Sequence, residues 1–263
     1  MHQKLVNFHI QNTFFILDFD QTVTTGGSAS SYSLFRRSGI LWKDYEEKTQ
    51  ELFSYFHPFE IDHTLPQKVR GKLMYDWHYW AFEVLKEMWL THEKFEQILN
   101  LHHLIHFRKG LKEFLQSLYE LWIPVIIFSA GIEQVIVRFL TENNVFFNNI
   151  YIQTNAMMFN DTGHFIGINR ETFIYPTEKT WDKVSKYTQN KLLWRQKYIL
   201  LWDMMDDITM APLESQYDGL KIGFLNRNAF EVKSGYESVF DIVIEDDSTD
   251  GGVLEQIINS LKK

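Results

Sequence analysis

The amino-acid sequence predicts an α/β fold, in which a parallel sheet with covering helices is interrupted by a helical insertion. Two observations lead to this prediction. From residue 109 onward, continuous apolar runs alternate with segments of helical periodicity, and such runs are typical of strands buried on both faces. Between residues 32 and 106 the pattern is helical, with no convincing strand. Strands that alternate with helices imply parallel strands joined by right-handed crossovers.

The first apolar run, residues 14–17, leads directly into the carboxylates of Asp18 and Asp20, with the hydroxyl of Thr22 close behind. Like charges this close repel each other and lose hydration, unless a cation lies between them or one of them binds a proton. Open α/β sheets bind ligands at the carboxyl ends of their strands. We therefore interpret this segment as a metal-assisted site. The alternative is a strand that ends in a solvated turn.

The helical segment that follows is expected to form an inserted cap. Gly26 and Gly27 lie in a polar turn that is a candidate hinge. Pro58 and Pro66 are expected to break the helices of the insertion. We predict a core of residues 1–24 and 107–263, with a cap of residues 25–106.

The α/β pattern resumes after the insertion. The expected helices are 109–121, 133–143, 180–194 and 252–261, the expected strands are 124–128, 149–154, 198–202, 220–225 and 240–244, and a hairpin is expected over 156–168.

Composition and charge limit the possible functions. The chain has 263 residues, of which 45% are hydrophobic, which is enough for a sizeable core. A net charge of −8 argues against binding of a nucleic-acid polymer. The chain contains no cysteine, which excludes disulfides and thiolate chemistry. There is no secretory pattern, and the uncharged apolar run 121–132 is too short for a membrane span. We expect a soluble, cytoplasmic protein that does not act at a membrane.

Polar residues follow three of the predicted strands: Asp18 with Asp20, Ser129, and Asp203 with Asp207. Each position has an ordinary explanation, because a serine after a strand is usually a turn or a helix cap, and an aspartate can cap a helix. In a parallel sheet, however, these strand ends share one edge. Together they indicate oxygen ligands that converge on one crevice.

Residues 18–23 resemble the first motif of haloacid-dehalogenase-type phosphatases, Asp-x-Asp-x-Thr. Ser129 stands where their second motif ends, and residues 202–211 resemble the fourth motif. The resemblance implies a Rossmann-like core with a helical cap of the C1 type. Four further segments are similar to the eukaryotic-type pyrimidine 5′-nucleotidase family: residues 59–62, 74–77, 127–132 and 222–226.

The resemblance also implies a mechanism. Asp18 attacks phosphorus and forms an aspartyl-phosphate, and Asp20 first donates and later accepts a proton. Mg²⁺ is held by Asp18, Asp203 and the backbone carbonyl of Asp20, with hard oxygen ligands that suit this ion. Ser129 and the amide of Ala130 hold phosphate oxygens.

The third motif of this superfamily supplies a cation, and Lys179 precedes the fourth motif at a suitable distance. Lys183 and Lys186 lie nearby and remain alternatives. The ordinary fate of a lysine is a solvated surface position. The resemblance implies that Asp207 holds this lysine and waters on the metal.

The cap is expected to select the substrate. Glu60 lies in the motif that reads the base in the nucleotidase family, and a carboxylate there can accept from an exocyclic amine. Trp77 belongs to an aromatic stretch, residues 75–82, of which one or two members are expected to stack on a base. The resemblance implies that the substrate is a nucleoside 5′-monophosphate, with a pyrimidine base favoured. Alternatives are phosphoserine or another small phosphometabolite, or a nucleotide-binding protein that has lost turnover.

Three departures from the family pattern bear on efficiency. Trp202 and Met204 replace the usual Gly and Ser of the fourth motif, and Ala81 stands where the nucleotidases have a Ser. The bulk of Trp202 is expected to narrow or shift the metal site. His102 and His106 are spaced as a zinc pair on a helix, but they have no obvious third ligand, so a helix end is the favoured interpretation.

Overall fold

The computed structural model describes residues 2–41, 43–60, 62, 64–226, 229–245 and 252–263, and within these ranges it does not describe the side chains of 2–3, 205–207 and 229–232. Its centre is a six-stranded sheet in the order β3-β2-β1-β6-β7-β8, with every neighbouring pair parallel. The predicted α/β fold is therefore confirmed. The strands are β1 Thr13–Leu17, β2 Val125–Ile132, β3 Ile150–Asn155, β6 Lys197–Trp202, β7 Asp218–Phe224 and β8 Ile242–Ile244.

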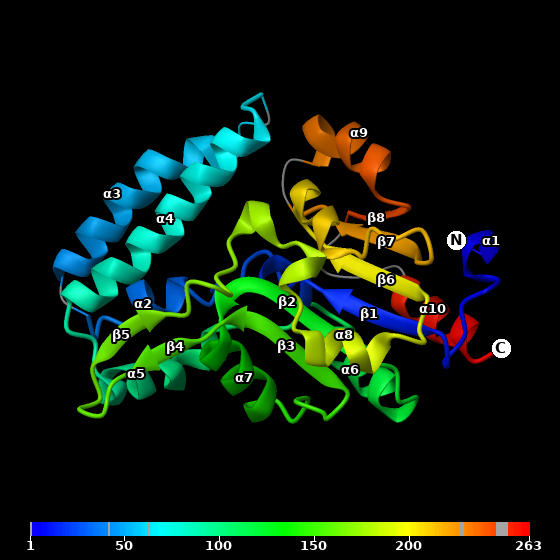
Figure 1. The fold of residues 1–263 in the computed structure, drawn as a ribbon, viewed down its shortest axis with the longest axis horizontal. Helices are drawn as coiled ribbons and strands as arrows, with labels where there is room; N and C mark the ends of the chain where they lie inside the picture. Colours follow the sequence, from blue (N-terminus) through cyan, green and yellow to red (C-terminus); the bar gives the residue numbers. More distant parts are fainter. Residues whose placement is uncertain (1, 42, 61, 63, 227–228, 246–251) are drawn as a thin grey trace.

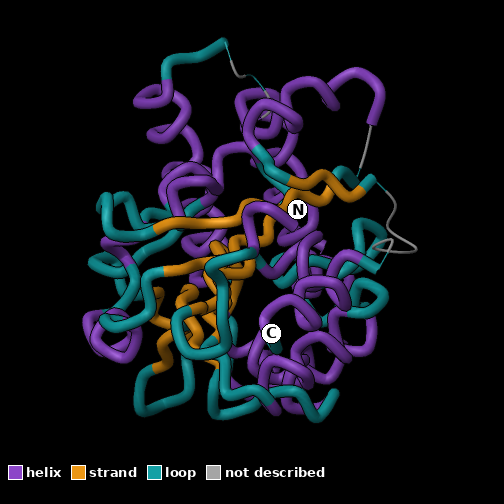
Figure 2. The backbone as a smooth tube through the Cα atoms, turned by 90° about the vertical axis from the view of Figure 1, so that its right-hand side faces the viewer, coloured by secondary structure: helices purple, strands orange, loops and turns teal. Residues whose placement is uncertain are grey.

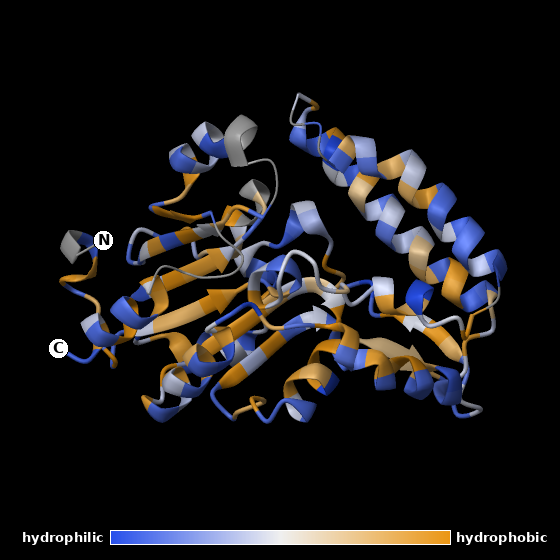
Figure 3. Ribbon diagram, turned by 180° about the vertical axis from the view of Figure 1, so that it is seen from behind, coloured by the Kyte–Doolittle hydropathy of each residue, from blue (hydrophilic) through white to orange (hydrophobic). Residues whose placement is uncertain are grey.

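The central strand β1 is completely buried, which explains its continuous apolar run. Phe15 and Leu17 belong to the hydrophobic cluster on one face of the sheet, and Phe14 and Ile16 to the cluster on the other. Because successive side chains of a strand point to opposite faces, a strand covered on both sides needs apolar residues at every position. The strands gather in the middle of the molecule (Figure 2) and are mostly hydrophobic (Figure 3).

Helices cover both faces of the sheet (Figure 1). Leu111, Phe139 and Ile257, from three different helices, pack into the same cluster as Phe15. Leu192 and Tyr236 pack on the opposite face with Phe14. These covering helices are α6 Leu111–Glu120, α7 Glu133–Glu142 and α10 Val253–Leu261 on the first face, and α8 Lys186–Leu192 and α9 Ala229–Val239 on the second; a short α1, His2–Leu5, precedes β1.

The strand order places a switch point between β1 and β6. The chain runs from β1 outward through β2 and β3, then returns to β6 on the other side of β1. Leu17 of β1 is in register with Leu201 of β6, and the amide of Asp18 donates to the carbonyl of Leu201 at 3.0 Å. Open α/β sheets bind ligands where the strand order reverses. Asp18 and Asp203 follow the two strands that flank this point.

The long helices α3 and α4 pack against each other at one end of the sheet (Figure 1), and α4 also contacts β5. Phe56 of α3 stacks on Trp77 of α4, with ring centroids 6.1 Å apart. Two connecting segments lie side by side: the amide of Thr25 donates to the carbonyl of His106 at 3.0 Å. The elements of this region are α2 Ser33–Arg37, α3 Lys43–Glu60, α4 Gln67–Glu87 and α5 His92–Leu99, with the hairpin β4 Met157–Phe159 and β5 Phe165–Ile168 beside them.

Several local predictions were wrong. Pro58 lies inside the last turn of α3 and does not break the helix there, whereas Pro66 stands directly before α4, as expected of a residue that separates two helices. The expected helix 180–194 is divided, because Ser185 begins a new helix by accepting from the amide of Thr188 at 3.1 Å. Strand β2 continues through Ser129 to Ile132, and α9 was not predicted at all.

Candidate active site

A cavity of about 380 Å³ lies where the strand ends meet helices α3 and α4. It is lined by the segment after β1, the far end of β2, the segments after β6 and β7, the segment that contains Pro176 and Lys179, the last turn of α3 and the middle of α4. Its lining includes Asp18, Asp20, Ser129, Ala130, Lys179, Asp203 and Asn226 from the core, and His57, Glu60 and His78 from the helices. The structure thus brings together every predicted core residue whose side chain it describes.

Asp18 forms a buried ion pair with Lys179. The ammonium nitrogen of Lys179 lies 2.8 Å from Oδ1 of Asp18. Lys179 is 5% exposed and Asp18 is 3% exposed. The hydroxyl of Thr22 donates to Oδ2 at 3.5 Å. Neither Lys183 nor Lys186 lines the cavity, and Lys186 is exposed with its ammonium donating to Gln189. Of the three lysines considered, only Lys179 is therefore placed to meet a phosphate.

Asp20 lies on the other side of the same turn. Its carboxylate accepts from the amide of Ser31 at 3.2 Å and from the hydroxyl of Ser31 at 3.1 Å. Burial raises the pKa of Asp20 to about 7, and the neighbouring charge of Asp18 adds to the shift. A carboxyl group with this pKa can both donate and accept a proton near neutrality. Asp18 and Asp20 therefore have different environments, which suits two different roles.

The far end of β2 presents polar groups to the cavity. The hydroxyl of Ser129 accepts from the amide of Gly131 at 3.0 Å. The carbonyl of Ala130 accepts from the hydroxyl of Tyr32 at 3.1 Å and from the side-chain amide of Asn155 at 2.7 Å. A Cβ atom on Gly131 would lie 2.5 Å from the hydroxyl oxygen of Ser31. A larger residue at this position would displace the Ser31 hydroxyl, which hydrogen-bonds to Asp20, at the close approach between β2 and the segment that leads to α2.

Asp203 follows β6 and is 6% exposed. The side-chain amide of Asn226 donates to its carboxylate at 3.5 Å, and the hydroxyl of Tyr236 donates to its backbone carbonyl. The preceding Trp202 is fully buried against Phe240, with ring centroids 4.2 Å apart, and does not line the cavity. The expectation that Trp202 narrows the site is therefore wrong, because alternation along the strand turns this side chain into the core. Met204 does line the cavity.

The donor chemistry of the cavity fits a hard divalent cation. Among the described residues that line it, four are carboxylates, Asp18, Asp20, Glu60 and Asp203, and Lys179 is the single lysine. Oxygen donors of this kind suit Mg²⁺, which retains several waters and needs few protein ligands. The side chain of Asp207, predicted as a further ligand, lies outside the described residues.

The zinc pair of His102 and His106, the less favoured interpretation of their spacing, does not form. His102 lies in a short 3₁₀ turn, Asn100–Leu104, and its Nδ1 is 3.2 Å from the carbonyl of Leu99. His106 follows beyond that turn, so the two residues do not share a helix face. Within the described part of the chain, no group of three or more His, Asp or Glu side chains is arranged to hold a metal.

A second cavity, also of about 380 Å³, adjoins the first and extends between α2, α3 and α4. Both cavities are lined by Gln21, Tyr32, His57, Glu60 and His78. Aromatic side chains make up much of the second lining, including Tyr45, Phe53 and Trp77. Glu60 thus lies between the strand ends and an aromatic chamber, and Trp77 lies in that chamber.

The other aromatic residues of the stretch 75–82 point elsewhere. Phe82 is buried in the core, and Tyr75 and Tyr79 stack on each other beside Phe173 and Arg170. Trp80 lines a different hollow between α3 and α4. Of the five aromatic candidates in this stretch, Trp77 lines the chamber, and Ala81, which replaces the family's Ser, lines it as well.

His78 was not considered from the sequence, although it adjoins Trp77. Its Nδ1 is 3.0 Å from the carbonyl of Met74, and its ring meets the ring of Tyr32 edge-on at 5.5 Å. Burial lowers the pKa of His78 to about 4. The imidazole is therefore neutral near pH 7, and it is one of the polar groups that line both cavities.

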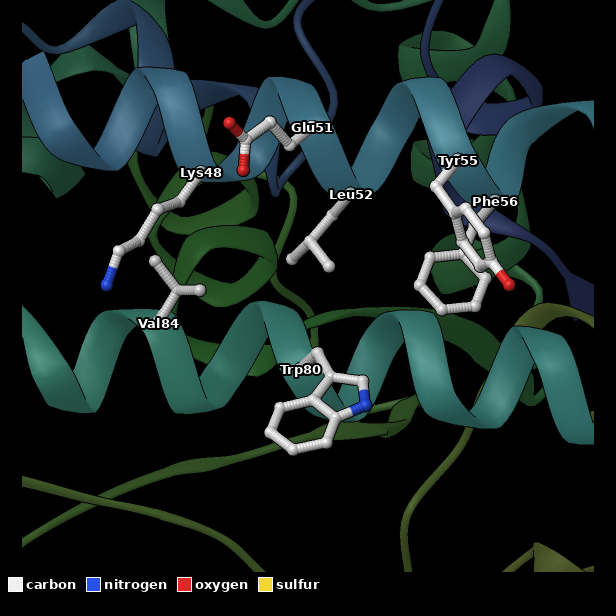
Figure 4. A pocket seen from close by; sticks show the side chains of 7 residues that line it. All are labelled: Lys48, Glu51, Leu52, Tyr55, Phe56, Trp80 and Val84. Atoms are coloured by element: carbon white, nitrogen blue, oxygen red, sulfur yellow. The ribbon is translucent and has the colours of Figure 1, made fainter.

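A separate hollow of about 400 Å³ lies between α3 and α4. Figure 4 shows its lining: Lys48, Glu51, Leu52, Tyr55 and Phe56 from α3, and Trp80 and Val84 from α4. It shares no residue with the cavity at the strand ends. The carboxylates and Lys179 therefore identify the cavity at the strand ends as the candidate active site.

The fold and this constellation define an α/β phosphatase with an aspartate at the switch point. The chain belongs to the pyrimidine 5′-nucleotidase family UMPH-1, whose model matches residues 20–262. This membership places it among the phosphoric monoester hydrolases.

Curated relatives agree with the family. A 7-methylguanosine phosphate-specific 5′-nucleotidase of Gallus gallus is 31% identical over 245 residues, which cover 89% of this chain and 83% of that protein. The protein of the same description from Homo sapiens is 30% identical over 257 residues, with coverages of 92% and 84%.

Solved structures support the same fold. A cytosolic 5′-nucleotidase IIIB bound to cytidine superposes with a TM-score of 0.86 at 25% identity, covering 99% of this chain and 89% of that one. A substrate-bound phosphoserine phosphatase superposes with a TM-score of 0.58 at 19% identity, covering 95% and 99%. The second likeness concerns the fold alone. Among the residues that the structure describes, no helix combines the length and apolar character needed to cross a bilayer.

Proposed function

We propose that this protein is a Mg²⁺-dependent 5′-nucleotidase that uses Asp18 as its nucleophile. The observation that carries the proposal is the buried pair of Asp18 and Lys179, which lies in the same cavity as Asp20. Lys179 holds the Asp18 carboxylate in place and offers positive charge where a phosphate dianion would bind. The raised pKa of Asp20 supports its use as an acid and a base.

The reaction proceeds in two steps. An oxygen of Asp18 attacks phosphorus and forms an aspartyl-phosphate, while Asp20 gives its proton to the departing 5′-oxygen of the nucleoside. Asp20 then accepts a proton from the water that attacks the phosphorus, and inorganic phosphate and the Asp18 carboxylate are released. Ser129, the amide of Ala130 and Lys179 bind the phosphate oxygens.

Mg²⁺ would be held by the carboxylates of Asp18 and Asp203 and by the carbonyl of Asp20. When bound, it neutralises the repulsion between the anionic nucleophile and the anionic phosphate. The excess of carboxylates among the described cavity residues supports this assignment. Asp207 is kept as a candidate from the sequence.

The substrate is a nucleoside 5′-monophosphate, with the phosphate at the strand ends and the base in the aromatic chamber. We favour 7-methylguanosine monophosphate, because its methylated base carries a positive charge that stacks well on aromatic rings. The indole of Trp77 supplies an aromatic ring for stacking, and the carboxylate of Glu60 supplies the opposite charge. The names of the relatives that are 30–31% identical support this choice.

A pyrimidine monophosphate is the second candidate. The family name and the structural relative that binds cytidine favour it. Phosphoserine is less well supported, since its small polar group would leave the aromatic chamber unfilled. A protein without turnover was suggested by Trp202 and Met204. Met204 lines the cavity, but Trp202 lies in the core, and Asp18, Asp20 and Lys179 share the cavity, so this alternative is less well supported.

Residues 25–106 are proposed to act as a cap that closes over the substrate, excludes bulk water and completes the site. The close pairing of the two connecting segments near Thr25 and His106 supports a common hinge. We also propose that the protein acts in the cytoplasm, in keeping with relatives named cytosolic 5′-nucleotidases.

Phosphate release from a panel of compounds tests the substrate. The panel contains the 5′-monophosphates of 7-methylguanosine, guanosine, cytidine and uridine, with phosphoserine and ribose 5-phosphate. We expect the highest kcat/KM for the 7-methylguanosine compound, with cytidine monophosphate next. Preferential hydrolysis of phosphoserine or ribose 5-phosphate would contradict the assignment of the chamber to a base.

A further inference from the structure

Arg108 lies beneath the active-site turn, although it carries no part of the chemistry described above. It follows the second connecting segment, and its backbone amide donates to the carbonyl of Val23 at 2.9 Å. The residue is only 3% exposed. A buried guanidinium loses hydration, so it requires hydrogen-bond acceptors in the protein that compensate for this loss.

The guanidinium binds the turn that follows Asp20. Its Nε donates to the carbonyl of Thr22 at 3.1 Å, and Nη2 donates to the carbonyl of Gln21 at 2.7 Å. Nη2 also donates to the side-chain oxygen of Asn226 at 2.6 Å. Its central carbon lies 4.1 Å from the ring centroid of Phe224, a cation–π contact.

Asn226 continues the connection to the other side of the switch point. Its side-chain nitrogen donates to the carbonyl of Gln21 at 2.8 Å and to the carboxylate of Asp203 at 3.5 Å. Gln21 therefore receives two donors on one carbonyl. Through Asn226, the turn after β1 and the carboxylate after β6 are tied to the same guanidinium.

The conformation of Gln21 makes this support necessary. Its φ is +63°, in the left-handed region that is unfavourable for a residue with a side chain. The neighbouring Asp20 has extended dihedrals, so its carbonyl direction depends on how the next peptide is held. Hydrogen bonds from Arg108 and Asn226 hold the peptide that follows.

We propose that Arg108 and Asn226 are positioning residues that set the carbonyl of Asp20 and the carboxylate of Asp203 for a divalent cation. This inference rests on the proposed Mg²⁺ site. Neither residue reacts with the substrate. Their effect is on the affinity of the site for the cation, because outer hydrogen-bond partners fix the orientation of the groups that bind it.

The test measures the midpoint of thermal unfolding against Mg²⁺ concentration, without substrate, for the wild type, Arg108→Lys, Arg108→Gln and Asn226→Ala. Arg195→Lys is the matched control. Arg195 is also buried, at 5% exposure, and its guanidinium donates to the carbonyl of Thr13 at 2.6 Å, at the start of β1. It therefore reports the cost of altering a buried arginine at the opposite edge of the sheet.

We expect the Mg²⁺ concentration for half of the thermal shift to rise about tenfold or more in Arg108→Gln and Asn226→Ala, with a smaller rise in Arg108→Lys. Arg195→Lys should lower the midpoint without metal and leave the Mg²⁺ dependence unchanged. The Mg²⁺ concentration for half-maximal phosphate release should change in parallel.

Unchanged Mg²⁺ dependence in Asn226→Ala and Arg108→Lys, with only a lower midpoint, would overturn the inference. If Arg108→Gln does not fold, these two milder variants decide it. If neither the unfolding midpoint nor the phosphate release of the wild type depends on Mg²⁺ concentration, the proposed function is overturned, and the inference with it. The two failures are therefore distinguishable.

Discussion

The ammonium of Lys179 lies 2.8 Å from the carboxylate of Asp18, although 161 residues separate them in the chain. Both side chains are buried, so neither charge is well solvated. A buried pair of this kind is weak evidence for stability, because desolvation offsets its attraction. Its place in the cavity that contains Asp20, Ser129 and Asp203 gives it a functional explanation.

Replacing Lys179 should disable phosphate binding. We expect Lys179→Met to lower kcat/KM about 10²–10³-fold, because it removes a fixed donor for the charge of the transferring phosphoryl group. Lys183→Met is the matched control, since Lys183 does not line the cavity. Steady-state phosphate release with both variants checks this. Equal losses would show that Lys179 is not the cation of the site.

Asp20→Asn should separate the two proton transfers. On a nucleotide we expect kcat to fall about 10²–10⁴-fold, since the 5′-oxygen leaves poorly without a proton. On p-nitrophenyl phosphate the leaving group needs no proton, so we expect a burst near one equivalent of p-nitrophenol and then slow turnover. Stopped-flow absorbance measures the burst. A similar loss on both substrates, with no burst, would contradict the acid–base role.

The aromatic chamber should affect only substrates that carry a base. We expect Trp77→Ala to cost about 1–3 kcal/mol in kcat/KM for a nucleotide, the value of one stacked base. Glu60→Gln should lower kcat/KM more for the 7-methylguanosine compound than for cytidine monophosphate, because it removes the negative charge opposite the cationic base. Both variants should leave kcat/KM for ribose 5-phosphate unchanged.

Glu51→Gln is the control for Glu60→Gln, since Glu51 lines the separate hollow between α3 and α4. It should behave as the wild type on all three substrates. A loss on ribose 5-phosphate as large as the loss on nucleotides would show that these residues do not contact a base.

His78 should make the folded protein less stable in mild acid. Its pKa is about 4 in the folded state, against an ordinary 6.5, so between these values the unfolded chain binds a proton that the folded chain does not. Lowering the pH from 7 to 5 should therefore cost about 1–2 kcal/mol through this residue.

The comparison with His78→Gln isolates this contribution, because glutamine can still hydrogen-bond and does not titrate. Urea unfolding at pH 7 and pH 5 gives the free energies. The loss between the two pH values should be smaller in the variant. An identical loss in both proteins would show that His78 does not carry the predicted pH dependence.

The core of the site could be predicted because it is encoded locally. Asp18 and Asp20 directly follow a buried strand, and Asp203 follows another, so the topology alone brings them to one edge. The structure of segment 180–194 was harder to predict, because Ser185 accepts a hydrogen bond from the amide of Thr188 and so begins a new helix within the segment. Helix α9 has little apolar periodicity, and this signal was the one used to predict helices.

The rest of the site depends on contacts between distant segments. His78 meets the cavity only because α4 packs over the strand ends, and Tyr32, which precedes α2, meets it through its hydrogen bond to the carbonyl of Ala130. Arg108 has no motif that marks it as part of the site, and its partners come from segments on both sides of it in the chain. The direction of Trp202 likewise follows from its place on β6, which turns its side chain into the core.

The most direct test of the account compares the wild type with Asp18→Asn, with and without Mg²⁺, by phosphate release from 7-methylguanosine 5′-monophosphate. Asparagine keeps the shape of the side chain but is not a nucleophile toward phosphorus. We expect release by the wild type only with Mg²⁺, and essentially none by a folded Asp18→Asn under either condition. Release by Asp18→Asn near the wild-type rate, or no release by folded wild type with Mg²⁺ from any nucleotide, would contradict the proposed mechanism.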